Sequence, residues 1–378
     1  MIAHAAPPPP VISAPAVSFG RVAVRVGPRT ERVEVQADGR VTARLRPPPG
    51  PRRLSVPVPT GIHPVRVRAI GRGGARWSAT VRVRALPRSA LRPGRIPGFV
   101  DRRLQRDVEG LASSMAAVTG VYVQHLVTGC GAAVNADAQF PAASTLKAAI
   151  LVDAVRRGRA ASLGPTLDRM IIDSDDRSAN TALAALGGGS GDAGAAQVTQ
   201  TLRDLGLGRS LVRRPFIIEN ARRPLPIETT RSPSLYTNFI STPYELARLM
   251  VAVHRGALGR GGVARIGIGV SAARAELLAR LLDVRDATKL VAGLPSGVPV
   301  AHKTGYTDEV RHDAGIVYLR SGPVAAAVMT WSPSGVAGTG ERFIARVATT
   351  ARARLAGGGA CEGLPLTPPG PRGSRGGA

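Results

Sequence analysis

The chain has 378 residues, of which 44% are hydrophobic and only 3% aromatic, and its formal net charge is +26. No stretch approaches the roughly 18 consecutive apolar residues of a membrane helix, so we expect no transmembrane segment. The basic residues are spread along the chain without a recognition-helix, zinc or aromatic RNA-binding pattern. Composition and charge therefore argue against a membrane-spanning protein and against specific nucleic-acid binding.

The N-terminal part of the chain predicts a short disordered segment followed by a small β domain. Residues 1–16 begin with a proline-rich stretch and are predicted to be disordered. Residues 17–86 alternate apolar and polar residues in short runs separated by turns such as Asp38-Gly39, which is typical of an antiparallel sandwich and resembles an immunoglobulin-like module. Four arginines alternate with valines and are expected to face solvent: Arg66, Arg68, Arg82 and Arg84.

Residues 87–97, rich in Arg, Pro and Gly, predict a linker, and residues 357–378 predict a disordered glycine- and proline-rich tail. Two cysteines, Cys130 and Cys361, are too few for a disulfide framework. They either form one bridge that ties the tail to the body or remain two thiols. The first 15 residues lack the charged start and apolar run of a secretory signal, so either the chain begins further upstream or it is not exported by that route.

Residues 98–356 predict a second, larger domain of the α+β class. Two strands, a block of helices, three strands and a last helix predict an antiparallel sheet covered by the first and last helices, with the middle helices as a second lobe. Expected helices are 101–117, an almost wholly apolar and hence buried helix at 144–157, one ending near 173, one running from the Thr242-Pro243 cap to 254, 272–282 and 340–355. Expected strands are 120–127, 132–135, 298–304, 313–319 and 324–331.

Only three of the 51 basic residues are lysines. Arginine keeps its proton in a protein, whereas burial and neighbouring charges can turn lysine into a neutral base, so a retained lysine marks a position where arginine would fail. Lys147 closes the segment Ser144-Thr145-Leu146-Lys147, and Lys303 opens Lys303-Thr304-Gly305. The third, Lys289, is interpreted as an ordinary surface residue.

Ser144 and Lys147 lie three residues apart at the start of the predicted buried helix, so both side chains project from one face. A serine becomes a nucleophile when a base lies within hydrogen-bonding reach, and a desolvated lysine can be that base. The helix N-terminus also favours negative charge nearby. On its own this spacing is a weak signal, because a serine at a helix start is commonly a cap.

Two further segments complete an ordered set: Ser174-Asp175-Asp176 and Lys303-Thr304-Gly305. Together with Ser144 to Lys147 they resemble the S-x-x-K, S-D-N and K-T-G motifs of serine β-lactamases and penicillin-binding proteins, the D,D-peptidases. The context is similar to the class A β-lactamase branch, both in the Phe140 to Ala143 lead-in and in the segment from Met170 to Asn180. The resemblance covers residues 98–355 and implies a β-lactamase/transpeptidase-like fold.

The resemblance also implies roles for individual residues. Ser144 would attack a carbonyl and become acylated, and Lys147 would accept or relay its proton. Ser174 would pass a proton to the departing nitrogen, while Lys303 with Thr304 would bind the substrate carboxylate.

Other residues would shape the site around the substrate. The backbone amides of Ser144 and Tyr306 would form an oxyanion hole. Gly305 would let the strand approach the substrate closely, and Arg311 is a candidate for contacting the substrate carboxylate. Asn180 matches a position whose side chain braces the neighbouring loop.

The second motif departs from the family pattern. The family asparagine donates an amide hydrogen to the substrate, whereas Asp176 only accepts when ionised. A carboxylate there would favour protonated Lys147 and repel an anionic substrate. An alternative alignment through Ser178-Ala179-Asn180 keeps the asparagine, but the first alignment preserves the spacing from Ser174 to Asn180 and is preferred.

The second departure concerns deacylation. Class A enzymes use a glutamate in an E-x-x-x-N context, and this chain shows none. Glu219 and Glu228 are the available carboxylates, each interpreted first as a solvated loop charge and second as a deacylation base. The segment between Lys147 and Ser174 is also shorter than in full class A enzymes, which predicts a trimmed helical lobe and a more open cleft.

These patterns predict a secreted or surface serine hydrolase that forms an acyl-enzyme on Ser144 and hydrolyses β-lactams. One alternative is a D,D-peptidase or penicillin-binding protein with slow deacylation. Another is a non-catalytic scaffold that binds cell-wall polymer through its basic N-terminal module.

Expected partners are a β-lactam or a D-alanyl-D-alanine-type peptide and, more loosely, an anionic cell-wall polymer. We expect a monomer without a cofactor. The six histidines show no metal-ligand spacing, so no metal is expected. An extracytoplasmic location follows from the resemblance alone.

Overall fold

The computed structural model describes residues 10–47, 52–71, 74, 76–92, 94, 98–216, 226–229 and 232–366. The chain forms two compact units that divide within the predicted linker, after Leu91. The linker region includes a short 3-10 turn, Arg88–Leu91. Within the described ranges, every helix is too short or too polar to span a bilayer.

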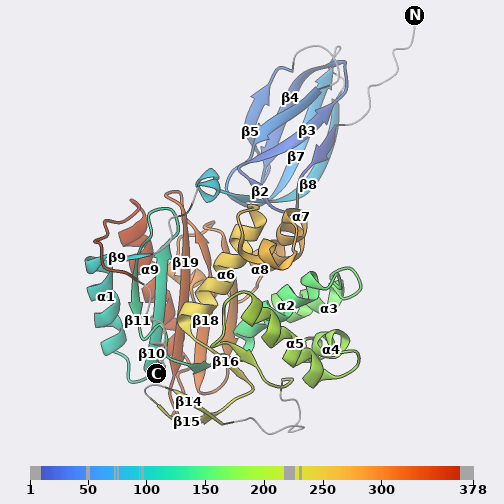
Figure 1. Cartoon of the computed structure of the whole chain (residues 1–378). Coiled ribbons are helices and arrows are strands. Elements are labelled where there is room, and N and C mark those ends of the chain that lie inside the picture. The colour runs from blue at the N-terminus through green and yellow to red at the C-terminus, as the bar shows by residue number, and fades with distance from the viewer. Residues whose placement is uncertain are drawn as a thin grey trace, which may run out of the picture. The chain divides into compact units, whose positions relative to one another are not determined.

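The N-terminal unit consists of two β-sheets that enclose a valine-rich core (Figure 1). Val24 of one sheet and Val67 of the other are both fully buried in this core. The predicted sandwich is therefore confirmed, while its kinship with immunoglobulin domains stays a prediction. One sheet has the order β1 (Val11–Ser13), β3 (Arg21–Val26), β6 (Arg52–Pro57), and the other β2 (Ser18–Phe19), β8 (Arg76–Leu86), β7 (Gly61–Gly71), β4 (Thr30–Ala37), β5 (Arg40–Leu45).

Along strands β7 and β8, more buried side chains alternate with more exposed ones, as the sequence pattern predicts. Val65, Val67 and Val83 are buried, whereas the four intervening arginines are exposed or half-buried. The prediction of disorder for residues 1–16 is wrong for Val11–Ser13. This segment pairs antiparallel with β3 because its apolar residues extend the sheet at an available edge.

The larger unit is built on one mixed sheet (Figure 1). All neighbouring strands in it are antiparallel except the short parallel pair at one end, β11 with β9. Strand β17 forms the opposite edge, so one side of it is available to a ligand. The order is β17 (Val300–Tyr306), β18 (Val310–Tyr318), β19 (Pro323–Trp331), β10 (Val118–His125), β11 (Cys130–Val134), β9 (Phe99–Val100).

Helices cover both faces of this sheet. Successive side chains of β10 point to opposite faces. Val123 lies beside Val347 of α9 (Thr339–Leu355), whereas Tyr122 makes an edge contact with Tyr244 of α6 (Pro243–Ala257). Helix α1 (Arg102–Ser113) packs against α9, so the first and last helices lie together as predicted.

A block of helices forms the second lobe. It contains α2 (Lys147–Arg156), α3 (Gly164–Ile172), α4 (Asp176–Leu186) and α5 (Gly191–Asp204). The predicted helix at 272–282 is present as α7 (Val270–Ala272), a π-helical segment (Ala273–Leu278) and α8 (Ala279–Leu282). Small strands β12 (Phe140–Pro141), β13 (Leu211–Val212), β14 (Pro226–Thr229), β15 (Ser232–Tyr236) and β16 (Phe239–Ser241) complete the unit.

The prediction of a disordered tail from residue 357 is wrong for residues 357–366. Cys361 forms a disulfide with Cys130 of β11. Backbone hydrogen bonds join Glu362 and Leu364 to Val100, and Leu366 to Gly98. A covalent bridge and strand-like pairing thus order a segment whose composition alone has little to bury.

Replacing both cysteines by serine is expected to destabilise this unit by about 2–4 kcal/mol, because the bridge closes a loop of 231 residues and restricts the unfolded chain. The melting temperature should fall by roughly 5–15 °C. Thermal unfolding with and without reductant measures the effect. The double variant serves as the control, since its melting temperature should not respond to reductant; an unchanged wild-type melting temperature after full reduction would contradict the prediction.

Candidate active site

Ser144 lies in a buried 3-10 turn, Ala143–Leu146, between strand β12 and helix α2. The α-helix itself begins at Lys147, so Ser144 precedes it by one turn where the sequence predicted a helix start. Ala143 has a φ of 47°, in the left-handed region that non-glycine residues seldom occupy. Such a conformation persists only where the surroundings enforce it, which is common at functional sites.

Lys147 is fully buried, and its ammonium group is surrounded by acceptors. Nζ donates to Asp176 Oδ1 at 2.5 Å, to the Ser174 carbonyl oxygen and to Ser174 Oγ at 3.4 Å. Burial lowers the pKa of Lys147, and the Asp176 carboxylate raises it against that larger effect. The amine therefore has a pKa below the ordinary lysine value while the Asp176 carboxylate favours its protonated form.

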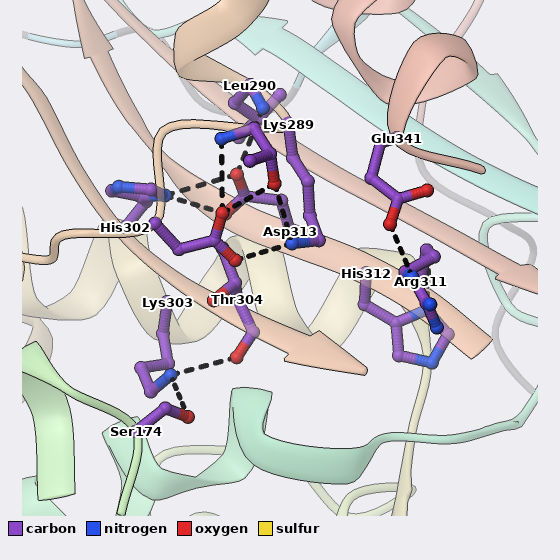
Figure 2. Close-up of polar contacts among 12 residues, drawn as sticks. Ser174, Lys289, Leu290, His302, Lys303, Thr304, Arg311, His312, Asp313 and Glu341 are labelled. Carbon is purple, nitrogen blue, oxygen red and sulfur yellow. Dashed lines mark hydrogen bonds and ion pairs between the residues drawn. The ribbon is translucent and has the colours of Figure 1, made fainter. Parts of the chain in front are cut away.

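Ser174 connects the two motif lysines, and Figure 2 shows its contact with Lys303. It lies between α3 and α4 and has a φ of 61°, again in the left-handed region. Its Oγ accepts from Lys303 Nζ at 2.8 Å and from Lys147 Nζ at 3.4 Å. Asp175 caps the following helix by accepting from the Ser178 amide at 2.7 Å, which holds this turn in place.

The third motif lies on the edge strand β17. Lys303 is fully buried and also donates to the Thr304 carbonyl oxygen at 2.9 Å. Burial lowers its pKa to about 7, with Lys147 acting in the same direction and Asp313 opposing it. The strand approaches the nucleophile turn so closely that a Cβ on Gly305 would lie 3.0 Å from the Ala142 carbonyl oxygen. Glycine is therefore needed at this position.

Tyr306, at the end of β17, has 59% of its surface exposed. Its ring lies 5.9 Å from Lys289 Nζ and 5.9 Å from the Arg311 guanidinium carbon. Tyr306 is thus an exposed large hydrophobic side chain beside the third motif.

The interpretation of Lys289 as an ordinary surface residue is wrong. It is only 3% exposed, and Nζ donates to Asp286 Oδ2 at 2.5 Å and to Thr288 Oγ1 at 3.2 Å. The adjacent Leu290 amide donates to the buried Asp313 carboxylate, which fixes this segment against β18. Because lysine is so scarce in this chain, each retained lysine marks a special position. This criterion, applied to all three lysines and not only to the two in the motifs, would have identified Lys289 as more than a surface lysine.

Behind Lys303, Asp313 also pairs with a buried histidine (Figure 2). His302 Nδ1 lies 2.9 Å from Asp313 Oδ1. The two residues come from neighbouring strands, β17 and β18, in offset register. Their spacing in the sequence matches no known motif. The contact could therefore be recognised only from the pairing of the two strands.

Arg311 is engaged in contacts of its own. Nε donates to Glu341 Oε1 at 2.5 Å, and Nη1 donates to the carbonyl oxygens of Thr307 and Val310. Figure 2 shows this side chain directed toward Glu341 and away from Ser174 and Lys303. A role in holding a substrate carboxylate would require it to leave these partners.

Asn180 braces the loop beside the site, as expected. Its Nδ2 donates to the Phe216 carbonyl oxygen at 3.0 Å, and its Oδ1 accepts from the Phe216 amide at 2.7 Å. Both polar atoms are thereby used, so Asp176 is the second-motif residue that contacts Lys147. This arrangement agrees with the preferred alignment.

Phe216 is a component of the site that the sequence patterns did not indicate. Its ring centroid lies 4.6 Å from Lys147 Nζ, and it stacks on Phe239 with ring centroids 4.0 Å apart. In its described part, up to Phe216, the braced loop therefore presents an aromatic ring beside Lys147. Of the two candidate deacylation bases, Glu219 lies outside the described residues, and for Glu228 in β14 the structure describes the backbone alone.

No metal site emerges from the part of the chain that the structure describes, where no three His, Cys, Asp or Glu side chains are grouped to hold an ion. His312 has protein partners instead: Nε2 donates to the Pro141 carbonyl oxygen at 2.7 Å, and Nδ1 accepts from the Thr330 amide at 3.2 Å. Burial lowers its pKa to about 4, which keeps the ring neutral. His312 therefore ties β18 to the strand that leads into Ser144.

The chain is similar to several proteins of known structure. PBP-A is 25% identical, with a TM-score of 0.55 over 68% of this chain and 97% of that chain. A variant of PBP-A, described as an acyl-enzyme complex with penicillin G, is 26% identical, with a TM-score of 0.55 over 68% of this chain and 98% of that chain. The β-lactamase from Streptomyces albus G is 21% identical, with a TM-score of 0.53 over 67% of this chain and 98% of that chain, which shows the fold alone.

No curated protein matches the chain. The sequence pattern of the "Beta-lactamase enzyme family" matches residues 103–163 and 155–355, which is more than half of the chain. That match spans all three motifs, and the sheet and helical lobe agree with the fold of the solved relatives. The chain therefore belongs to the β-lactamase enzyme family.

Proposed function

We propose that this protein forms an acyl-enzyme on Ser144 with β-lactams and with D-alanyl-D-alanine-type peptides, and that it releases the acyl group slowly. The observation that carries the proposal is the continuous hydrogen-bonded series from Lys147 through Ser174 to Lys303. The series joins two buried amines and one hydroxyl, and Ser144 precedes Lys147 by one turn on the segment that leads into α2.

The reaction follows from these contacts. Neutral Lys147 removes the proton from Ser144 as Oγ bonds to the carbonyl carbon of the substrate. The carbon–nitrogen bond then breaks, and the departing nitrogen receives a proton from the Ser174 hydroxyl, which is replenished from Lys147. Lys303 and Thr304 hold the substrate carboxylate, and the amides of Ser144 and Tyr306 stabilise the negative charge on the carbonyl oxygen.

Relatives and redox state support the substrate class and the compartment. A relative that is 26% identical is described as an acyl-enzyme complex with penicillin G. The Cys130–Cys361 disulfide is typical of proteins outside the reducing cytosol. Cell-wall peptides also occur outside the cytosol. An extracytoplasmic enzyme that reacts with such peptides and with β-lactams accounts for both observations.

Slow release of the acyl group is proposed because Phe216 occupies the braced loop beside Lys147. A phenyl ring cannot take a proton from the water that must attack the ester. Rapid β-lactam hydrolysis is the second candidate, favoured by the match to the β-lactamase family, and it would need a base from elsewhere, such as Glu219 or Glu228. Rapid colour change with nitrocefin would favour the second candidate, and lasting fluorescent-penicillin labelling with little turnover would favour the first.

Incubating wild-type protein with penicillin G is expected to add one penicilloyl group to the intact mass, and Ser144→Ala should add none. The change removes one hydroxyl from a buried turn and leaves the fold intact, which a thermal melt can check. Peptide mapping should place the adduct on the segment that contains Ser144. An adduct that persists in Ser144→Ala would show that another nucleophile reacts and would overturn the proposal.

A further inference from the structure

Asp176 is the part of the site that departs from the family pattern, and it lies where a substrate can reach it. It is the first residue of α4, and 46% of its side chain is exposed, whereas its partner Lys147 is wholly buried. The carboxylate therefore contacts Lys147 while part of its side chain remains accessible to solvent.

We propose that Asp176 makes the enzyme select acyl donors whose side chain carries a positive charge, and that such a group frees Lys147 to act as the base. The inference rests on the proposed acylation of Ser144. It names a substrate class, cationic acyl side chains, that neither the family membership nor the motifs assign.

Aspartate and asparagine at this position differ in the hydrogen bonds that they offer a substrate. An asparagine at this position would offer two N–H donors to a carbonyl of the substrate side chain, whereas an ionised aspartate offers none. The oxygen of a substrate carbonyl or carboxylate placed there would be repelled by the carboxylate oxygens of Asp176. An ammonium group would instead form a charge-assisted hydrogen bond with Asp176.

Asp176 also affects the ability of Lys147 to act as a base. The three N–H donors of the Lys147 ammonium group are met by the Ser174 carbonyl oxygen, Ser174 Oγ and Asp176 Oδ1. Lys147 must be neutral to accept the Ser144 proton, and the carboxylate at 2.5 Å opposes that by raising the pKa of the amine. A substrate cation that shares the carboxylate weakens this opposition, so the same contact aids binding and deprotonation.

Three penicillins test the inference because they share the ring system and a phenylacetyl-type side chain. Ampicillin carries an amino group on the carbon next to the side-chain carbonyl, penicillin G a hydrogen and carbenicillin a carboxylate. The second-order rate of adduct formation on Ser144 is measured by intact mass at pH 6.5, where an α-amino group is protonated. The variants are wild type, Asp176→Asn and Asp173→Asn.

In wild type, ampicillin is expected to acylate about five- to tenfold faster than penicillin G, and carbenicillin slower by a similar factor, as suits a partly exposed charge pair. Asp176→Asn should bring the three rates within about twofold of one another. Asp173→Asn is the matched control: it removes a carboxylate from the same segment, but one paired with Arg285 and not with Lys147. It should keep the wild-type ratios.

Ratios that are unchanged in Asp176→Asn, or equal rates with all three penicillins in wild type, overturn the inference while the proposed function stands. Absence of a Ser144 adduct with every penicillin removes the proposed function and the inference with it. Because the ratio compares substrates on one protein, a general change in the activity of a variant does not affect the conclusion.

Discussion

Replacing Lys147 with arginine is expected to slow penicillin acylation of Ser144 by about 10³-fold, within the range attributed to general-base catalysis. The guanidinium keeps its proton in a protein, so it cannot accept the serine proton. The position is fully buried and touches Ser174, Asp176 and the Phe216 ring, so a larger planar group also fits poorly. The intact mass of samples quenched at successive times after mixing with penicillin G gives the acylation rate.

Lys147→Met serves as the second variant, because it fills a similar buried volume without a charge and removes the donor only from the half-exposed Asp176 and from the oxygens of Ser174. Both variants should fold, as judged by circular dichroism and thermal melting, and both should react slowly. If Lys147→Arg folds and reacts at the wild-type rate, Lys147 is not the base and the proposed acylation mechanism is wrong.

Replacing Phe216 with glutamate is expected to speed release of the penicilloyl group by at least about 10²-fold, the lower range for an added general base. The ring lies 4.6 Å from Lys147 Nζ, and the backbone is held by both polar atoms of Asn180. A carboxylate from this fixed backbone position would lie close to the acylated serine and could activate water. Loss of adduct mass after removal of free penicillin, together with nitrocefin turnover, measures the effect.

Phe216→Gln is the matched control, because it has nearly the shape of glutamate but cannot accept a proton at neutral pH. Both variants lose the stacking on Phe239 and should be destabilised by about 2–4 kcal/mol, so a difference between them isolates the carboxylate. Equal release rates in the two variants would mean that this loop position does not face the acyl group. A wild type that already releases penicilloyl as fast as Phe216→Glu would favour the β-lactamase alternative.

Much of the larger unit could be predicted from the sequence. The three motifs each lie within a few residues, and the spacing of Ser144 and Lys147 depends only on helical geometry. Five of the six strands of the large sheet were predicted, with ends that differ from the observed ones by only a few residues, whereas the short β9 was not expected. In the N-terminal unit, the alternation of valine with arginine was enough to predict two half-buried sheets.

Errors arose where long-range contacts override local composition. Lys289 sits in a polar stretch typical of a surface, yet Asp286 neutralises it in a buried position beside β17. The tail from residue 357 has the glycine content of a disordered segment, yet Cys130, 231 residues away, fixes it. No window of sequence contains both partners of the latter contact.

By itself, then, the sequence determined the family and the order of elements, and it singled out Ser144 and Lys147 as candidate catalytic residues, because these depend on neighbouring residues and on a shared pattern. The tertiary structure decided what surrounds that lysine: the carboxylate of Asp176, the hydroxyl of Ser174 and the ring of Phe216. Ser174 and Asp176 come from one segment and Phe216 from another, and both segments reach Lys147 only in the folded helical lobe. The pKa of a buried amine depends on such neighbours, so the chemistry of the site follows from packing.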